Sequence, residues 1–150
     1  MPTITKIDGL VQDSNTIEIT LSDGKVIKQY HRQDCCEYVA VHQVDGNISK
    51  HIGAKYIELL CKSRRAQNDE VSASGTWTFY TLKTSKGYLD WRWLGESNGY
   101  YSENVTTVTL YPLELARDNS IELVDITAYN FDKEDYTSKS LFKWKLLGNI

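Results

Sequence analysis

An alternation of apolar and polar residues with a period of two is the feature that most constrains how this chain can fold. Residues 16–21 alternate Ile17, Ile19 and Leu21 with polar side chains. This alternation is typical of a β-strand with one buried face. An Asp-Gly turn signal follows, and residues 26–31 resume an extended pattern, so the two segments predict a β-hairpin.

Similar segments recur along the chain, separated by turn residues. The strongest is a central hairpin of residues 76–84 and 88–94, in which Leu89, Trp91 and Trp93 share one face of the return strand. Further strands are expected at residues 37–44 and 105–111 and, on a weaker alternation, at 121–129. Residues 55–62 could form a helix or a strand, and their alternation favours a strand. Residues 113–117 could form one helical turn, and residues 136–147 form either a closing strand or a short amphipathic helix.

Length and composition agree with one compact domain of mainly β structure. A chain of 150 residues fits a single globular domain over residues 1–150, and its 41% hydrophobic and 25% charged residues exclude intrinsic disorder. Short strands with regular turn signals predict a single antiparallel β-sandwich or half-barrel. Its C-terminal end is expected to be a short helix or strand, and an α+β arrangement is the alternative.

Charge and cysteine content bear on location and partners. The net charge of -3 lacks the excess of cations that a general nucleic-acid binder needs. We see no secretory signal at the N-terminus and no run of apolar residues long enough to cross a membrane. Three cysteines, two of them adjacent, make a poor disulfide framework and suit a reducing cytoplasm. A homo-oligomer is compatible with these features.

Catalytic and metal-binding motifs are weak. Residues 95–99 match the G-x-S-x-G pattern around Ser97, but a Thr/Val strand follows instead of a helix, and no histidine follows in the chain. A thiol–imidazole pair would need Cys35 or Cys36 beside His31 or His42. The spacing of cysteine and histidine residues does not suit zinc, so neither metal nor cofactor is expected. These features favour a protein that is not an enzyme.

The segment after the central hairpin concentrates side chains that suit ligand recognition. Arginine can pair with phosphate through two parallel hydrogen bonds, aromatic rings stack on bases or sugars, and amide or carboxylate groups read polar edges. The alternative is a solvated turn whose tyrosines cover a sheet edge. Likewise, Arg92 either forms a surface salt bridge with Asp90 or Glu96 or anchors an anion. The candidate ligand-binding residues here are Arg92, Glu96, Ser97, Asn98, Tyr100 and Tyr101.

Three stretches together resemble a family of small proteins of unknown function encoded by bacteriophages and bacteria. They read QDCCE at residues 33–37, TWTFY at 76–80 and RWLGESNGYYSE at 92–103, and the resemblance spans about residues 30–107. It implies a phage or prophage setting and a cytosolic protein, and it carries no catalytic residues to transfer. Positions that recur in the family add weight to the candidate site, among them Cys35, Cys36 and Glu37.

The preferred hypothesis is a binding protein that captures a small ligand, such as a nucleotide immune signal, and so acts as an anti-defence sponge. Its pocket would be built by residues 95–103 together with a turn that contains Cys36 and Glu37. One alternative is an inhibitor that binds a host enzyme through its protein surface. The least favoured alternative is a hydrolase or thiol enzyme that uses Ser97, Cys35 or Cys36.

Overall fold

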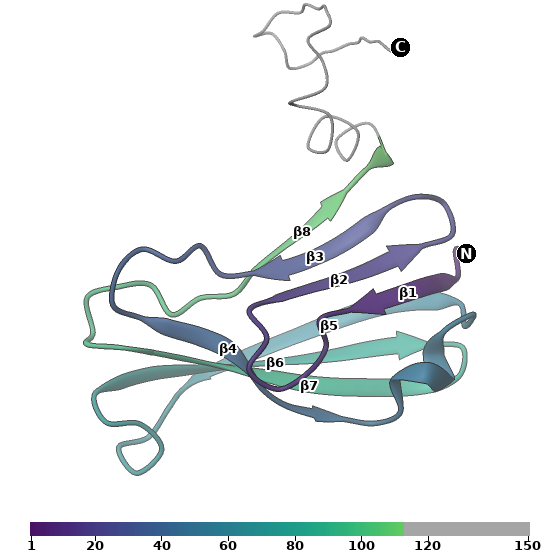
Figure 1. Ribbon diagram of the computed structural model, residues 1–150. Coiled ribbons are helices and arrows are strands. Elements are labelled where there is room, and N and C mark those ends of the chain that lie inside the picture. The colour runs from purple at the N-terminus through teal and green to yellow at the C-terminus, as the bar shows by residue number, and fades with distance from the viewer. Residues whose placement is uncertain (113–150) are drawn as a thin grey trace, which may run out of the picture. The chain divides into compact units, whose positions relative to one another are not determined.

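The computed structural model describes residues 1–112 and shows eight strands and one short 3-10 helix (Figure 1). The elements are β1 (Ile4–Asp8), β2 (Thr16–Leu21), β3 (Val26–Tyr30), β4 (Tyr38–Asp45), η1 (Ile48–His51), β5 (Tyr56–Arg65), β6 (Ser74–Thr84), β7 (Gly87–Ser97) and β8 (Thr106–Leu110). The elements predicted at residues 113–117, 121–129 and 136–147 lie outside the described residues.

The strands form two four-stranded sheets, with the order β1-β2-β3-β8 in one and β4-β7-β6-β5 in the other. All neighbouring strands run antiparallel. The sheets pack together as a β-sandwich and do not close into a barrel, which confirms the predicted mainly β class. None of the described residues belongs to a helix long and apolar enough to span a membrane.

The central hairpin is longer than its alternation predicted. β6 and β7 pair without a register shift from Ser74 opposite Ser97 to Thr84 opposite Gly87. The alternation predicts a return strand that ends at residue 94, and Gly95 carries no side chain that could extend the pattern. The backbone nevertheless continues the ladder through Ser97. The G-x-S-x-G segment therefore begins inside a strand and runs into a turn, and the next element along the chain is the strand β8.

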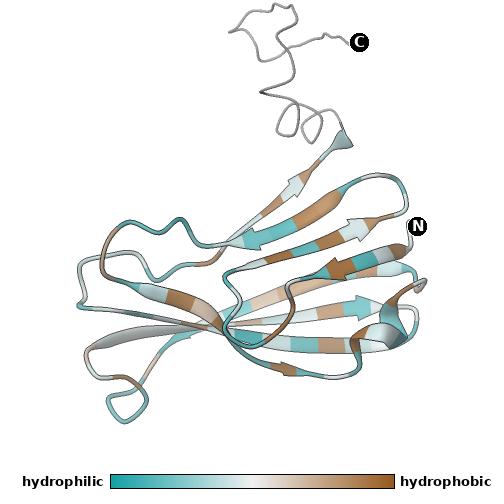
Figure 2. Cartoon of the chain, in the orientation of Figure 1, coloured by the Kyte–Doolittle hydropathy of each residue, from teal (hydrophilic) through white to brown (hydrophobic). Residues whose placement is uncertain are grey.

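Apolar side chains from both sheets fill the space between them, and the alternating bands along the strands are visible in Figure 2. β2 contributes every second residue, as predicted, and Ile17 and Ile19 are fully buried. From the opposite sheet, Leu89, Trp91 and Trp93 of β7 point inward and are almost completely buried. Their burial fixes which face of β7 is internal, because successive side chains of a strand point to opposite faces.

One polar side chain joins the two sheets inside this core. Gln29 on β3 is fully buried, and its Oε1 accepts hydrogen bonds from Nε1 of Trp91 at 3.0 Å and from Nε1 of Trp93 at 3.2 Å. A buried indole N–H needs an acceptor, since an unpaired buried donor costs about 1–3 kcal/mol. A single carboxamide oxygen thus accepts hydrogen bonds from two tryptophans, while Nε2 of Gln29 has no partner in the described part of the chain.

We expect Gln29→Met to destabilise the domain. The substitution keeps the length of the side chain but leaves both indole donors without an acceptor, and it also removes the unpaired amide nitrogen. The net loss in the free energy of unfolding should be about 1–3 kcal/mol, measured by urea denaturation. Gln12→Met, at an exposed position, is the control and should change stability by less than about 0.5 kcal/mol. Equal stability of Gln29→Met and the wild type would show that the bridge contributes nothing.

Candidate functional site

Arg92 lies on the outer face of the β4-β7-β6-β5 sheet, as its position between two buried tryptophans requires. Its guanidinium carbon is 4.9 Å from the centre of the Trp77 ring, and its Nη2 donates a 2.6 Å hydrogen bond to Oε1 of Gln43 on β4. Its Nε is buried and has no hydrogen-bond partner among residues 1–112. Among residues 1–112 no carboxylate forms an ion pair with Arg92.

A second arginine on the same face differs in its charge balance. The Arg64 guanidinium lies 5.9 Å from the ring centres of both Trp77 and Phe79. Its two terminal nitrogens each donate a 3.2 Å hydrogen bond to the Glu70 carboxylate. The hydrogen bonds from Arg64 are the main reason that the pKa of Glu70 falls to about 2, and the same contact raises the pKa of Arg64. The charge of Arg64 is therefore balanced by a carboxylate, whereas Arg92 has no such partner among residues 1–112.

Aromatic rings form the floor beneath these arginines. Trp77 and Phe79 stack with their centres 6.2 Å apart, and the His42 ring meets Trp77 edge-on at 5.0 Å. Trp77 is almost completely buried although it lies on the outer face of its sheet. The guanidinium groups of Arg64 and Arg92 lie over its ring on this face. Sequence reasoning identified Arg92 but missed Gln43 and Arg64, because neighbours on adjacent strands become visible only when the register is known.

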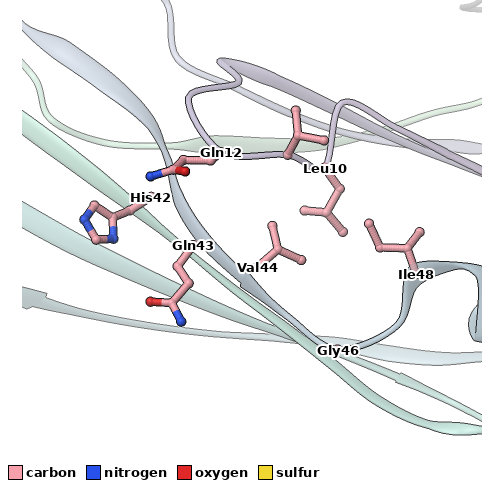
Figure 3. A pocket seen from close by; sticks show the side chains of 8 residues that line it. Leu10, Gln12, His42, Gln43, Val44, Gly46 and Ile48 are labelled. Atoms are coloured by element: carbon pink, nitrogen blue, oxygen red, sulfur yellow. The ribbon is translucent and has the colours of Figure 1, made fainter.

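A hollow lies next to this face, between β4 and the loop that joins β1 to β2 (Figure 3). Backbone hydrogen bonds of 2.8 Å from Asp13 N to Val41 O and from Val41 N to Ser14 O hold the loop against β4. We call this space, of about 540 Å³, the β4 hollow. It is lined by Leu10, Val11, Gln12, His42, Gln43, Val44, Gly46 and Ile48. None of these residues was among the candidate ligand-binding residues, although His42 was considered as the base of a thiol–imidazole pair.

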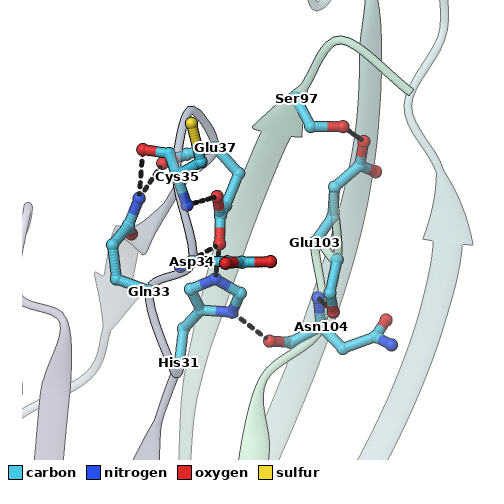
Figure 4. A network of polar contacts seen from close by, with 9 residues as sticks. His31, Gln33, Asp34, Cys35, Glu37, Ser97, Glu103 and Asn104 are labelled. Atoms are coloured by element: carbon cyan, nitrogen blue, oxygen red, sulfur yellow. Dashed lines mark hydrogen bonds and ion pairs between the residues drawn. The ribbon is translucent and has the colours of Figure 1, made fainter. Parts of the chain in front are cut away.

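Glu37 organises the loop between β3 and β4 (Figure 4). Its buried carboxylate accepts hydrogen bonds from Nε2 of His31 at 2.7 Å and from the backbone N–H groups of Asp34 at 2.9 Å and Cys35 at 3.0 Å. The hydrogen bond from His31, aided by those backbone groups, lowers the pKa of Glu37 from 4.5 to about 2 although burial opposes the shift. Both oxygens of the Glu37 carboxylate are therefore already engaged by donors within the protein.

His31 connects this loop to the segment between β7 and β8. Its Nδ1 lies 2.8 Å from the carbonyl oxygen of Asn104, while Nε2 faces Glu37 (Figure 4). Both partners are acceptors, so both ring nitrogens must carry a proton for both hydrogen bonds to form. The His31 side chain is thus buried between a carboxylate and a backbone carbonyl group. The pair joins the two loops at one end of the sandwich.

Ser97 belongs to a second polar cluster, around Glu103. Its hydroxyl donates to the Glu103 carboxylate and accepts a 2.9 Å hydrogen bond from Gly99 N, and Thr76 donates to the same carboxylate at 2.7 Å. Burial would raise the pKa of Glu103, but hydrogen bonds, above all that from Ser97, hold it below its usual value. A Cβ at Gly95 would lie 2.4 Å from the Glu103 carbonyl oxygen, so this close approach requires glycine.

The remaining candidate residues lie in the turn after β7 and in the loop after β3. Asn98 Oδ1 accepts a 3.0 Å hydrogen bond from Tyr100 N, which closes a local turn. Tyr100 is 83% exposed, and its ring meets that of Tyr101 edge-on with the ring centres 5.0 Å apart.

Cys35 and Cys36 form a disulfide between neighbouring residues, which differs from the separate thiols expected from sequence. Both cysteines lie in a bend before β4.

The structure therefore divides the candidate residues that the sequence grouped as one site. Arg92 and Glu96 share the outer face of β7, and Glu96 lies opposite Tyr38 of β4. Glu37 and Ser97 are engaged in hydrogen bonds that shape the loops. In the described part of the chain, no three His, Cys, Asp or Glu side chains gather as a metal site would require.

We expect Glu37→Gln to lower the melting temperature at pH 7. The variant should also change how the melting temperature varies with pH in the acidic range. The carboxylate has a lowered pKa in the folded state, so its contribution to stability is present above about pH 4.5 and is lost as the pH falls towards 2. The difference in melting temperature between wild type and variant should therefore narrow over this interval.

Glu96→Gln is the matched control, because the Glu96 side chain makes no hydrogen bond or ion pair within residues 1–112. Its melting temperature should follow that of the wild type at each pH. A difference between wild type and Glu37→Gln that stays constant from pH 7 to pH 2 would contradict the proposed charge pair.

Comparison with known proteins places these strands within one family. No curated protein and no solved structure matches the chain. A family model described as a domain of unknown function, DUF7448, matches residues 2–107. The match begins well before residue 30, where the resemblance noted from motifs began, and so includes the first hairpin as well as the central one. Because the match covers most of its length, the chain belongs to the DUF7448 family.

Proposed function

We propose that this protein binds a small anionic ligand of the nucleotide type on the outer face of the β4-β7-β6-β5 sheet, with Arg92 as the anchor of the anion. The observation that carries the proposal is the contrast between two arginines over one aromatic floor. Arg64 is neutralised by Glu70, whereas Arg92 has no carboxylate partner within residues 1–112.

The surroundings of Arg92 prepare it for an anion. Contact with Trp77 and the hydrogen bond to Gln43 hold the guanidinium in place, so less side-chain entropy is lost when a ligand binds. Its remaining donors can form charge-assisted hydrogen bonds, which contribute about 1.5–3 kcal/mol each. The salt bridges of Arg92 with Asp90 or Glu96 that were considered from the sequence are absent within residues 1–112. Asp90 instead accepts a hydrogen bond from the Thr81 hydroxyl at 2.6 Å, and Glu96 lies four positions further along β7.

Capture of a ligand needs no nucleophile, and the groups that could have served as one have other contacts. The Ser97 hydroxyl is engaged with Glu103, and Cys35 is bonded to Cys36. In a phage or prophage setting, the captured ligand would be a nucleotide signal of host immunity in the host cytoplasm. The protein would then act by sequestration.

A second candidate function is inhibition of a host protein through the same face. Three large side chains on it are exposed: Tyr38 by 57%, Leu60 by 46% and Tyr88 by 59%. Tyrosine and arginine are frequent among the residues that dominate protein interfaces. A pull-down from host extract separates the two functions, because a stoichiometric protein partner would support inhibition and replace the sponge proposal.

We expect Arg92→Ala to keep the fold and to lose most of the ligand affinity. The protein is incubated with extract of signalling cells, repurified and heated, and the released small molecules are identified and titrated by calorimetry. Arg92→Ala should bind roughly 10–150-fold more weakly, which corresponds to the loss of one charge-assisted contact. Arg92→Lys should restore little, since an ammonium cannot reproduce the planar fork.

Arg64→Ala is the matched control. It also removes an arginine side chain that lies over the aromatic floor, but Arg64 is already paired with a carboxylate. Its affinity should stay within about twofold of the wild type. Equal affinity of the wild type and a folded Arg92→Ala, or the absence of any released anion, would contradict the proposal.

A further inference from the structure

The β4 hollow has two chemically different ends. Leu10, Val44 and Ile48 supply an apolar end, while the side chains of Gln12, His42 and Gln43 lie at the other end (Figure 3). The ring nitrogens of His42 make no hydrogen bond within residues 1–112, so they are available to a ligand. A few polar groups at one end of an apolar recess are typical of small-molecule sites.

Gln43 belongs both to the hollow and to the surroundings of Arg92. Its Oε1 accepts the hydrogen bond from Arg92 at 2.6 Å, and its Nε2 donates to Oδ1 of Asp45 at 3.0 Å. The polar end of the hollow therefore adjoins the guanidinium of Arg92. An anionic group held at Arg92 would place the rest of its molecule beside this opening.

We infer that the β4 hollow receives the base of a nucleoside monophosphate whose phosphate is held by Arg92; this inference rests on the proposed function and specifies its ligand. Apolar side chains would contact the faces of the base, and the amide of Gln12 and the ring of His42 would pair with its polar edge or with the ribose hydroxyls. Arg92 would supply two parallel donors to the phosphate.

The size of the hollow agrees with a single nucleotide. Its volume of about 540 Å³ lies within the range of sites that take small molecules. The loop that forms its upper wall is tied to β4 by the backbone hydrogen bonds at Val41, so the recess exists before a ligand arrives. A preformed recess reduces the entropy lost on binding.

The test uses calorimetry with the full chain and three kinds of probe: the four common nucleoside 5′-monophosphates, the four corresponding nucleosides, and inorganic phosphate. Val11 lines the hollow and is 61% exposed, so Val11→Trp should fill the recess without disturbing the core. Asn15→Trp, on the same loop but outside the lining, is the matched control. Gln12→Trp serves as a second filling variant should Val11→Trp fail to fold, which its melting temperature would reveal.

We expect the wild type to bind at least one monophosphate about tenfold or more tightly than phosphate alone. Val11→Trp should reduce that affinity to the level of phosphate, while its affinity for phosphate and the affinities of Asn15→Trp stay unchanged. Arg92→Ala should weaken the binding of both phosphate and nucleotide.

The outcomes separate this inference from the proposal on which it rests. Unchanged nucleotide affinity in both filling variants, together with loss in Arg92→Ala, would overturn the role of the hollow and leave Arg92 as an anion anchor. Nucleotide binding that is lost in the filling variants but unaffected in Arg92→Ala would support the hollow and overturn the anchor. No binding of any probe by the wild type would overturn this inference, and the absence of any anion released from cell extract would overturn the proposed function.

Discussion

The carboxamide of Gln29, held between the indole groups of Trp91 and Trp93, joins the two sheets at the centre of the molecule. Hydrogen bonds have direction, so this contact specifies how β3 lies against β7 in a way that apolar packing alone does not. It also secures the inward face of β7. Because side chains alternate along a strand, an inward Trp91 and Trp93 require that Arg92 point outward. The position of the candidate anion anchor is thus a consequence of how the core is built.

Two polar clusters shape the end of the sandwich where β3 leads into β4 and β7 leads into β8. One centres on the carboxylate of Glu37 and the ring of His31, the other on Glu103 with Ser97 and Thr76. Both carboxylates are nearly buried and have lowered pKa values because several donors face them. Residues of types that are common in binding sites therefore serve here to hold loops in place. Their chemistry satisfies buried backbone and side-chain groups.

The two arginines over Trp77 show how the same residue type can differ in what it offers a ligand. Glu70 pairs with Arg64 through two hydrogen bonds, whereas within residues 1–112 Arg92 contacts an aromatic ring and an amide but no carboxylate. A cation held by these contacts beside a recess is the arrangement that suggests the proposed ligand class. The neighbouring Gln43 connects that cation to the β4 hollow.

Local pattern by itself determined the strands other than β1, since the alternation at residues 16–21, the turn signals and the paired aromatic residues near 76–94 are properties of neighbouring positions. It also determined that Arg92 faces away from Trp91 and Trp93. Only the tertiary structure decided that Glu37 and Ser97 are engaged within the protein, that Gln43 rather than a carboxylate meets Arg92, and that a loop near residue 11 forms a recess with β4. These facts depend on contacts between segments far apart in the chain. The register of β4 against β7 and the packing of one sheet on the other create those contacts, and no local periodicity encodes them.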